Sequence, residues 1–223
     1  MSRAGWLPVE LSAGASLRLS KPTDDLEGRL VVLGLGGSGF RAATPRWSAS
    51  ITWLMRRLER DLPELAYAEL RYGDRSLHAI GESIRDAREA LGVLPASSPI
   101  ALLGFSMGGG IAIAVAGDPR VRGVIGLAPW VPDQISLAPL RGRRLAILHG
   151  SRDGYVPLLP SVSPEHSRRA MERAAAAGAR TSYTLIDRAI HAIAVRTPLG
   201  LVPLPHAGAW SAAVAGHLRE LAD

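Results

Sequence analysis

Residues 99–118 read PIALLGFSMGGGIAIAVAGD, and this stretch decides the fold. An apolar run, Ile100–Leu103, leads into Gly104-Phe105-Ser106-Met107-Gly108, and small apolar residues continue to Ala116. The pattern predicts a buried strand, a sharp turn with Ser106 at its apex, and a helix. Glycine is needed on both sides of the serine because a side chain there would collide with the neighbouring strand or helix.

Such a turn exposes the Ser106 hydroxyl and places the backbone N–H of Met107 beside it at the start of the helix. Unpaired amides and the positive end of the helix dipole favour negative charge at that point. We therefore interpret the G-x-S-x-G pattern as a nucleophile elbow. Two alternatives are a glycine-rich turn in a packed core and a membrane span, since Ile100–Gly117 carries no charge. The central glycines and the lack of a basic flank disfavour the span.

The composition fits one globular domain over residues 1–223. The chain is 47% hydrophobic and 21% charged, and it has no cysteine, which excludes disulfides and thiolate metal sites. No metal or cofactor is expected. The N-terminal MSRAGWLPVELSAG lacks the continuous apolar region of a signal peptide, so a cytoplasmic protein is expected.

The net charge of +6 raises the question of nucleic-acid binding. The arginines are interspersed with acids, as in Arg56-Arg57-Leu58-Glu59-Arg60-Asp61, which is typical of a solvated helix face. Arg141, Arg143 and Arg144 form one small cluster without interleaved aromatic residues. We expect no nucleic-acid partner.

The rest of the chain predicts an α/β fold. Alternating apolar residues over 7–19 predict an antiparallel hairpin at a sheet edge. From residue 30 onward strands alternate with helices, which indicates a mostly parallel twisted sheet covered by helices on both faces. The expected strands are 30–33, 66–72, 100–103, 121–127, 145–148 and, as the last strand, 182–186; the expected helices are 50–62, 83–91, 109–116, 163–177 and 209–221.

A serine hydroxyl needs a base to take its proton, and the base needs an acid to orient it. In a parallel sheet, residues just past the carboxyl ends of the strands gather at one edge. Asp153 follows strand 145–148 and His191 follows strand 182–186, so the chain order is Ser106, Asp153, His191. We predict Ser106 as nucleophile, His191 as general base and Asp153 as the orienting acid.

Other residues compete for these roles. Asp133 also follows a strand and Asp187 lies just before His191, so either is a rival acid. His149 is expected to be a strand-end residue bonded to backbone, because it precedes Asp153 by only a few positions.

Residues 34–39, Gly-Leu-Gly-Gly-Ser-Gly, match the dinucleotide-binding pattern G-x-G-x-x-G. That interpretation requires an acid about 20 residues on, at the end of the next strand. Glu59 has the right distance but lies in a predicted helix, and Asp74 lies too far away. We favour an oxyanion hole, in which the N–H groups of Leu35 and Met107 hold the developing negative oxygen.

Three ordered motifs carry a family resemblance: Gly-Phe-Ser-Met-Gly-Gly (104–109), His-Gly-Ser-Arg-Asp-Gly-Tyr-Val-Pro (149–157) and the late His191. Residues 30–221 resemble the α/β-hydrolase superfamily, in particular its small members without a lid, of the dienelactone-hydrolase, carboxylesterase and thioesterase type. The chain departs from the family in having Leu33-Gly34 where His-Gly is common. Dienelactone hydrolases usually carry Cys at the elbow, so Ser106 indicates ester or thioester cleavage.

The short connection 131–144 leaves no room for a helical lid, so the site is expected to be open and shallow. It is expected to lack a fixed charged anchor, which suits small or medium carboxylic esters or thioesters as substrates. The expected substrate-binding residues are Gly36, Phe105, Trp130, Tyr155 and Val156, with Leu35 also in the apolar wall.

The sequence leaves two alternative functions open. The same acyl-enzyme serves acyl transfer, cyclisation or perhydrolysis, and the fold also occurs in non-catalytic ligand-binding proteins. The oligomeric state is not predicted.

Overall fold

The computed structural model describes residues 5–38, 46–154 and 161–223. Its centre is an eight-stranded sheet in the order β1-β2-β4-β3-β5-β6-β7-β8. β1, β2 and β4 pair antiparallel, and every other pairing in this sheet is parallel. The strands are β1 (Leu7–Glu10), β2 (Ser16–Leu19), β3 (Val31–Leu35), β4 (Ala66–Arg71), β5 (Ile100–Phe105), β6 (Val121–Leu127), β7 (Arg144–Gly150) and β8 (Arg180–Ile186).

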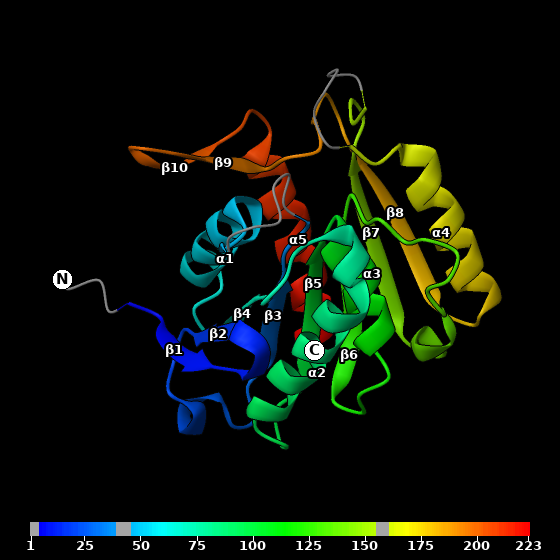
Figure 1. Cartoon of the computed structure of the whole chain (residues 1–223). Helices are drawn as coiled ribbons and strands as arrows, with labels where there is room; N and C mark the ends of the chain where they lie inside the picture. The colour runs from blue at the N-terminus through cyan, green and yellow to red at the C-terminus, as the bar shows by residue number, and fades with distance from the viewer. Residues whose placement is uncertain (1–4, 39–45, 155–160) are drawn as a thin grey trace.

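Helices cover both faces of this sheet, as predicted (Figure 1). α2, α3 and α4 pack on one face, and α1 and α5 pack on the other. The helices are α1 (Ala49–Asp61), α2 (Ile80–Val93), α3 (Met107–Val115), α4 (Pro164–Ala176) and α5 (Ala207–Ala222). The predicted fold class is therefore confirmed, including the antiparallel hairpin β1–β2 at one edge.

Alternate side chains of the inner strands enter two separate cores, because neighbouring residues of a strand point to opposite faces. In β3, Leu33 and Leu35 pack on the side of α2 and α3, while Val32 packs on the side of α1 and α5. Trp210 and Val214 of α5 are fully buried in the second core, as expected. The two cores hold the carboxyl ends of β3, β5, β7 and β8 in fixed positions.

One expectation about the strands is wrong. Strand 182–186 is not the last, because β9 (Ala194–Thr197) and β10 (Gly200–Pro203) follow it as a separate antiparallel hairpin. Pro198-Leu199-Gly200, which follows the alternating Ile193, Val195 and Thr197, was the available turn signal. The hairpin projects above α1 at the upper left of Figure 1 and packs against that helix.

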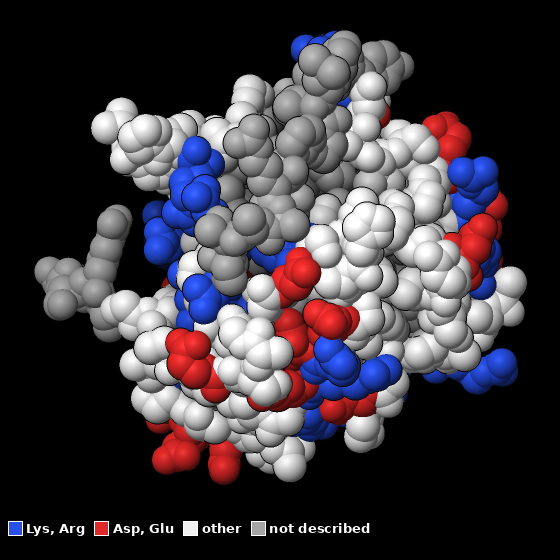
Figure 2. All heavy atoms as spheres, in the orientation of Figure 1, with Lys and Arg blue, Asp and Glu red and all other residues white. Residues whose placement is uncertain are grey.

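The surface charges are mixed. Figure 2 shows acidic and basic groups side by side over the lower half of this face, as the interspersed arginines predicted. Within the described ranges, no helix combines the length and apolar character needed to cross a membrane.

Candidate active site

The elbow between β5 and α3 holds Ser106 in a strained backbone conformation. Its φ is 53° and its ψ is −120°, a combination that residues other than glycine rarely adopt. Three backbone hydrogen bonds of 2.9 Å hold it there: the Ser106 N–H donates to Leu127 O, and the Ser106 carbonyl accepts from the N–H groups of Gly109 and Trp130. The end of β6 and the loop that follows it thus hold the serine backbone through its N–H and its carbonyl.

The glycines of the elbow are required by close packing. A β-carbon on Gly104 would lie 2.3 Å from the carbonyl oxygen of Gly108, and one on Gly108 would lie 2.2 Å from the carbonyl oxygen of Leu35. Real β-carbons essentially never approach a heavy atom so closely. A β-carbon at either place would therefore force the turn to shift.

A histidine and an aspartate meet at the same edge of the sheet. His191, in the loop after β8, donates from Nδ1 to Oδ2 of Asp153, in the turn after β7, at 2.6 Å. The carboxylate can only accept, so Nδ1 carries the proton and Nε2 is left free to accept one. Burial pushes the pKa of Asp153 upward, but hydrogen bonds from His149 and His191 outweigh it and the net shift is downward. Asp153 is therefore the ionised partner that an imidazolium requires.

Ser106, Asp153 and His191 line one cavity of about 390 Å³. The rings of Phe105 and His191 are tilted against each other with centroids 5.0 Å apart, which fixes the imidazole beside the elbow. Within the described residues, the Ser106 hydroxyl makes no hydrogen bond to the His191 ring; such bonds are often loose before substrate binds.

The rival acids lie elsewhere. The Asp133 side chain is 98% exposed and pairs with Arg173, and the Asp187 side chain is 84% exposed and pairs with Arg188. Neither bonds a histidine within the described part of the chain. Of the three acids considered, the geometry joins only Asp153 to His191.

The expected oxyanion donors flank the elbow. Met107 is the first residue of α3, so its N–H has no partner within the helix. Leu35 ends β3 in register with Gly104 of β5 and is fully buried. Their role stays a prediction. The dinucleotide interpretation of this loop loses its acid, because Glu59 lies in α1 and accepts a hydrogen bond from Trp6.

The expected substrate-binding residues are only partly brought together. Phe105 lines the cavity, whereas Trp130 lines a different hollow beside His166. Gly36 packs against Ser48, with its virtual β-carbon 2.8 Å from Ser48 Cβ. The remaining two, Tyr155 and Val156, lie outside the described residues.

The structure corrects the expectation that the site lacks a charged anchor. Arg75 and Arg152 both line the cavity. The Arg75 guanidinium donates to Gly37 O from Nε at 3.1 Å and from Nη2 at 2.7 Å, and to Arg46 O from Nη1 at 2.8 Å. Burial lowers its pKa. No ion pair joins it to an acid of the described ranges, which contain every Asp and Glu of the chain.

Sequence reasoning also missed one wall of the cavity. Ala194 and Val195 of β9, together with Leu204 after β10, line the cavity with Ser106. Because β9 and β10 were not predicted, no pattern connected these residues with Ser106.

Solved structures with the same architecture are numerous, although no protein-family model and no curated protein matches the sequence. Est1E from Butyrivibrio proteoclasticus superposes with a TM-score of 0.68 at 14% identity, covering 98% of this chain and 99% of its own. MGS-M1, an α/β-hydrolase enzyme from a Medee basin deep-sea metagenome library, gives 0.68 at 18% identity, covering 98% and 99%. The dienelactone hydrolase-like promiscuous phosphotriesterase P91 from metagenomic libraries gives 0.66 at 18% identity, covering 96% and 97%.

This chain has the α/β-hydrolase fold. Three-residue Ala138–Leu140 is the longest helix between β6 and β7, so this α/β-hydrolase fold has no lid domain there. In α/β hydrolases the nucleophile, acid and base follow in that chain order, which Ser106, Asp153 and His191 also do.

Proposed function

We propose that the chain is a serine hydrolase that cleaves small or medium carboxylic esters or thioesters through an acyl-enzyme. The observation that carries this proposal is the 2.6 Å bond between Asp153 and His191 in the cavity that also exposes the strained Ser106. A hydroxyl, a base and an orienting acid are the groups with which a serine nucleophile carries out acyl transfer.

In the first half of the reaction the Ser106 oxygen attacks the ester carbonyl while Nε2 of His191 takes the hydroxyl proton. Asp153 holds Nδ1–H and stabilises the imidazolium that forms. The N–H groups of Met107 and Leu35 hold the negative oxygen of the tetrahedral intermediate. The carbon–oxygen or carbon–sulfur bond then breaks, and His191 returns its proton to the leaving group.

In the second half, water attacks the acyl-enzyme. His191 takes a proton from the water, and the second tetrahedral intermediate collapses to a carboxylic acid and free Ser106, which recovers its proton from His191. No redox step or external group is needed in this sequence.

The cavity supports a small organic ester as substrate. Its volume of about 390 Å³ is in the range of small-molecule sites, and Phe105, Val195 and Leu204 give it apolar walls. One structural relative, Est1E, has been solved with ferulic acid bound. Arg75 adds a positive charge to the wall of this cavity, and its guanidinium donates hydrogen bonds to the backbone carbonyls of Gly37 and Arg46.

Covalent labelling with a fluorophosphonate probe tests the proposal. We expect the wild type to be labelled and Ser106→Ala to remain unlabelled. Rates of hydrolysis of p-nitrophenyl esters of increasing acyl length then show which acyl length the enzyme prefers. Persistent labelling of Ser106→Ala would refute the proposed nucleophile. Tight ligand binding without turnover across the ester panel would favour a non-catalytic ligand-binding protein.

A further inference from the structure

A second histidine touches the acid of the candidate triad. The side chain of His149, near the end of β7, is fully buried, and its Nε2 lies 3.0 Å from Oδ2 of Asp153. That is the same oxygen that accepts from His191. The sequence predicted that His149 is bonded to backbone; it does bond Val162 O at 2.8 Å, but it also bonds Asp153.

The position of one proton on His149 follows from its neighbours. Nε2 faces the Asp153 carboxylate and the Val162 carbonyl, and both of these groups only accept hydrogen bonds. Nε2 therefore carries a proton, which is shared between the Asp153 carboxylate at 3.0 Å and the Val162 carbonyl at 2.8 Å. The other carboxylate oxygen, Oδ1, accepts the Val162 N–H at 3.3 Å, so the acid is held by donors on three sides.

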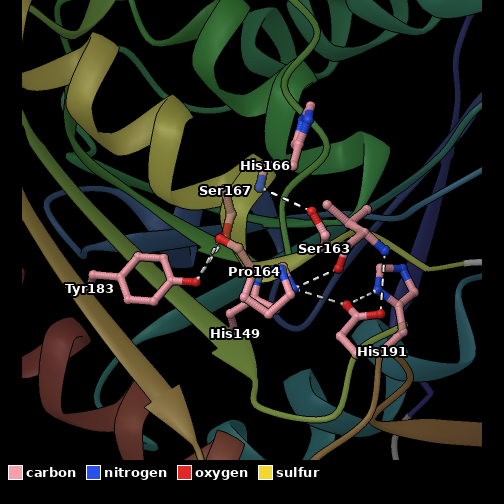
Figure 3. Close-up of polar contacts among 9 residues, drawn as sticks. His149, Ser163, Pro164, His166, Ser167, Tyr183 and His191 are labelled. Atoms are coloured by element: carbon pink, nitrogen blue, oxygen red, sulfur yellow. Dashed lines mark hydrogen bonds and ion pairs between the residues drawn. The ribbon is translucent and has the colours of Figure 1, made fainter. Parts of the chain in front are cut away.

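The far side of the His149 ring is held as well (Figure 3). Nδ1 lies 2.7 Å from the Ser167 hydroxyl on α4, and that hydroxyl lies 3.0 Å from the Tyr183 hydroxyl on β8. Both hydroxyls also reach the carbonyl of Pro164, at 3.0 and 3.1 Å. Within this network, every polar atom of the ring has a partner from a different element than its own.

A buried histidine with satisfied bonds is often only a core residue, and one feature separates His149 from that case. Besides the Val162 carbonyl, its Nε2–H reaches the oxygen that orients His191, so the side chain contacts the candidate triad directly. Loss of that donor would leave Oδ2 with one partner in a buried site, where an unsatisfied charged acceptor is costly. The carboxylate would then rotate or take a proton, and either change alters its bond to His191.

We propose that His149 is a positioning residue that holds the Asp153 carboxylate in the orientation and charge state that His191 requires, and that Ser167 and Tyr183 hold His149 in turn. This inference rests on the proposed function. His149 does not line the cavity, so it acts through Asp153 and not on the substrate.

The test compares His149→Leu, which removes the donor, with His149→Gln, whose amide can donate again. His217→Leu serves as the matched control, because His217 lies on α5 and its ring meets only Glu220, at 3.9 Å, among the ion pairs of the described chain. For His149→Leu we expect kcat on p-nitrophenyl butyrate to fall about 10- to 100-fold with little change in KM, the size of effect seen when a hydrogen-bond partner behind a metal-binding side chain is removed. His149→Gln should recover part of the loss, and His217→Leu should match the wild type.

A second readout does not depend on turnover. The proton shared by His191 Nδ1 and Asp153 should give a strongly downfield proton resonance, which we expect to move or vanish in His149→Leu and to persist in His149→Gln. An unmoved resonance together with wild-type kcat in His149→Leu would overturn the inference. If the wild type neither turns over esters nor is labelled, the proposed function is refuted. If its downfield resonance still changes in His149→Leu, the hydrogen-bond network around Asp153 is nevertheless supported.

Variants of Ser167 and Tyr183, the two residues that hold His149, keep the inference testable if His149→Leu does not fold. Ser167→Ala removes the partner of His149 Nδ1, and Tyr183→Phe removes only the outermost hydroxyl. We expect graded losses of kcat, larger for Ser167→Ala than for Tyr183→Phe. Wild-type kcat in both variants together with an unmoved resonance would overturn the proposed role of Ser167 and Tyr183 in holding His149.

Discussion

Gly108 of the elbow helix packs directly against the carbonyl oxygen of Leu35, which a β-carbon at position 108 would approach to 2.2 Å. The same β-carbon would lie 2.6 Å from the carbonyl oxygen of Gly36. The start of α3 and the loop after β3 therefore form one packed unit. Any side chain placed between them must displace both the elbow and the expected oxyanion loop.

Gly108→Ala tests this packing. We expect the free energy of unfolding to fall by about 1–3 kcal/mol, the usual cost of overpacking a core, and fluorophosphonate labelling of Ser106 to slow. Urea denaturation measures the first effect. Gly216→Ala on α5 is the control, because nothing lies within 4 Å of its virtual β-carbon, and this change should be neutral or stabilising by up to about 1 kcal/mol. Equal effects of the two substitutions would contradict the prediction.

Substitution of the acids separates Asp153 from its rivals. We expect Asp153→Asn to lower kcat on p-nitrophenyl esters by about 10⁴-fold, because the amide no longer selects the required imidazole tautomer. Asp133→Asn and Asp187→Asn should keep wild-type kcat, since both side chains are exposed and bond only arginines. A large loss in either of these two variants, with an active Asp153→Asn, would reassign the acid.

The lowered pKa of Asp153 predicts an acid-dependent contribution to stability. Because the folded pKa lies below the ordinary value near 3.8, the folded state binds fewer protons than the unfolded state around that pH. The contribution is present above the unfolded pKa and is lost as pH falls through the folded pKa. We expect the difference in unfolding free energy between wild type and Asp153→Asn, measured in urea, to change below about pH 4. A difference that stays constant down to pH 2 would be inconsistent with the shift.

Arg75 should hold the loop after β3, because it joins the carbonyls of Gly37 and Arg46. A β-carbon on Gly37 would lie 3.0 Å from Ser106 Cβ, so a shift of this loop reaches the nucleophile. We expect Arg75→Met to lower kcat/KM by about 10- to 100-fold, the usual effect of small misplacements at a reacting centre. Arg85→Met, which removes an exposed arginine paired with Glu82, is the control and should have little effect.

The β9–β10 hairpin should set the acyl-length preference, because Val195 lines the cavity. In Val195→Trp we expect kcat/KM for p-nitrophenyl hexanoate to fall about tenfold or more, with acetate nearly unchanged, since each methylene in an apolar pocket is worth about 10-fold or more. Leu199→Trp changes a side chain that is 99% exposed at the hairpin tip and should not alter the preference. A parallel loss for all chain lengths in Val195→Trp would indicate misfolding of the hairpin instead.

The sheet and the candidate triad were predictable because they depend on local signals. Apolar runs mark strands buried on both faces, and glycine on both sides of Ser106 marks the turn. The order of strands then places Asp153 and His191 at one edge. Trp210 and Val214 were predictable for the same reason, since helical spacing alone shows which side faces the core.

The remaining parts of the site depend on contacts between distant segments. Asp153 accepts from His149 at the end of its own strand and from His191 in the loop after β8, and no spacing in the sequence shows that both rings reach the same oxygen. Trp130 was expected in the pocket wall, but the loop after β6 directs it to another hollow, and its backbone N–H rather than its ring serves Ser106. Arg75 could not be assigned, because its partners are carbonyls that any sequence would supply.

The β9–β10 hairpin lies in the sequence between His191 and α5, and its two strands do not pair with the main sheet. Ala194 is buried in the core beside α1 and α5, whereas residues 195–204 are only partly buried or exposed and can be exchanged more freely. A library confined to positions 195–204 would sample new pocket shapes while the eight central strands that position the candidate triad stay unaltered, which makes this hairpin the natural starting point for redirecting the protein toward other substrates.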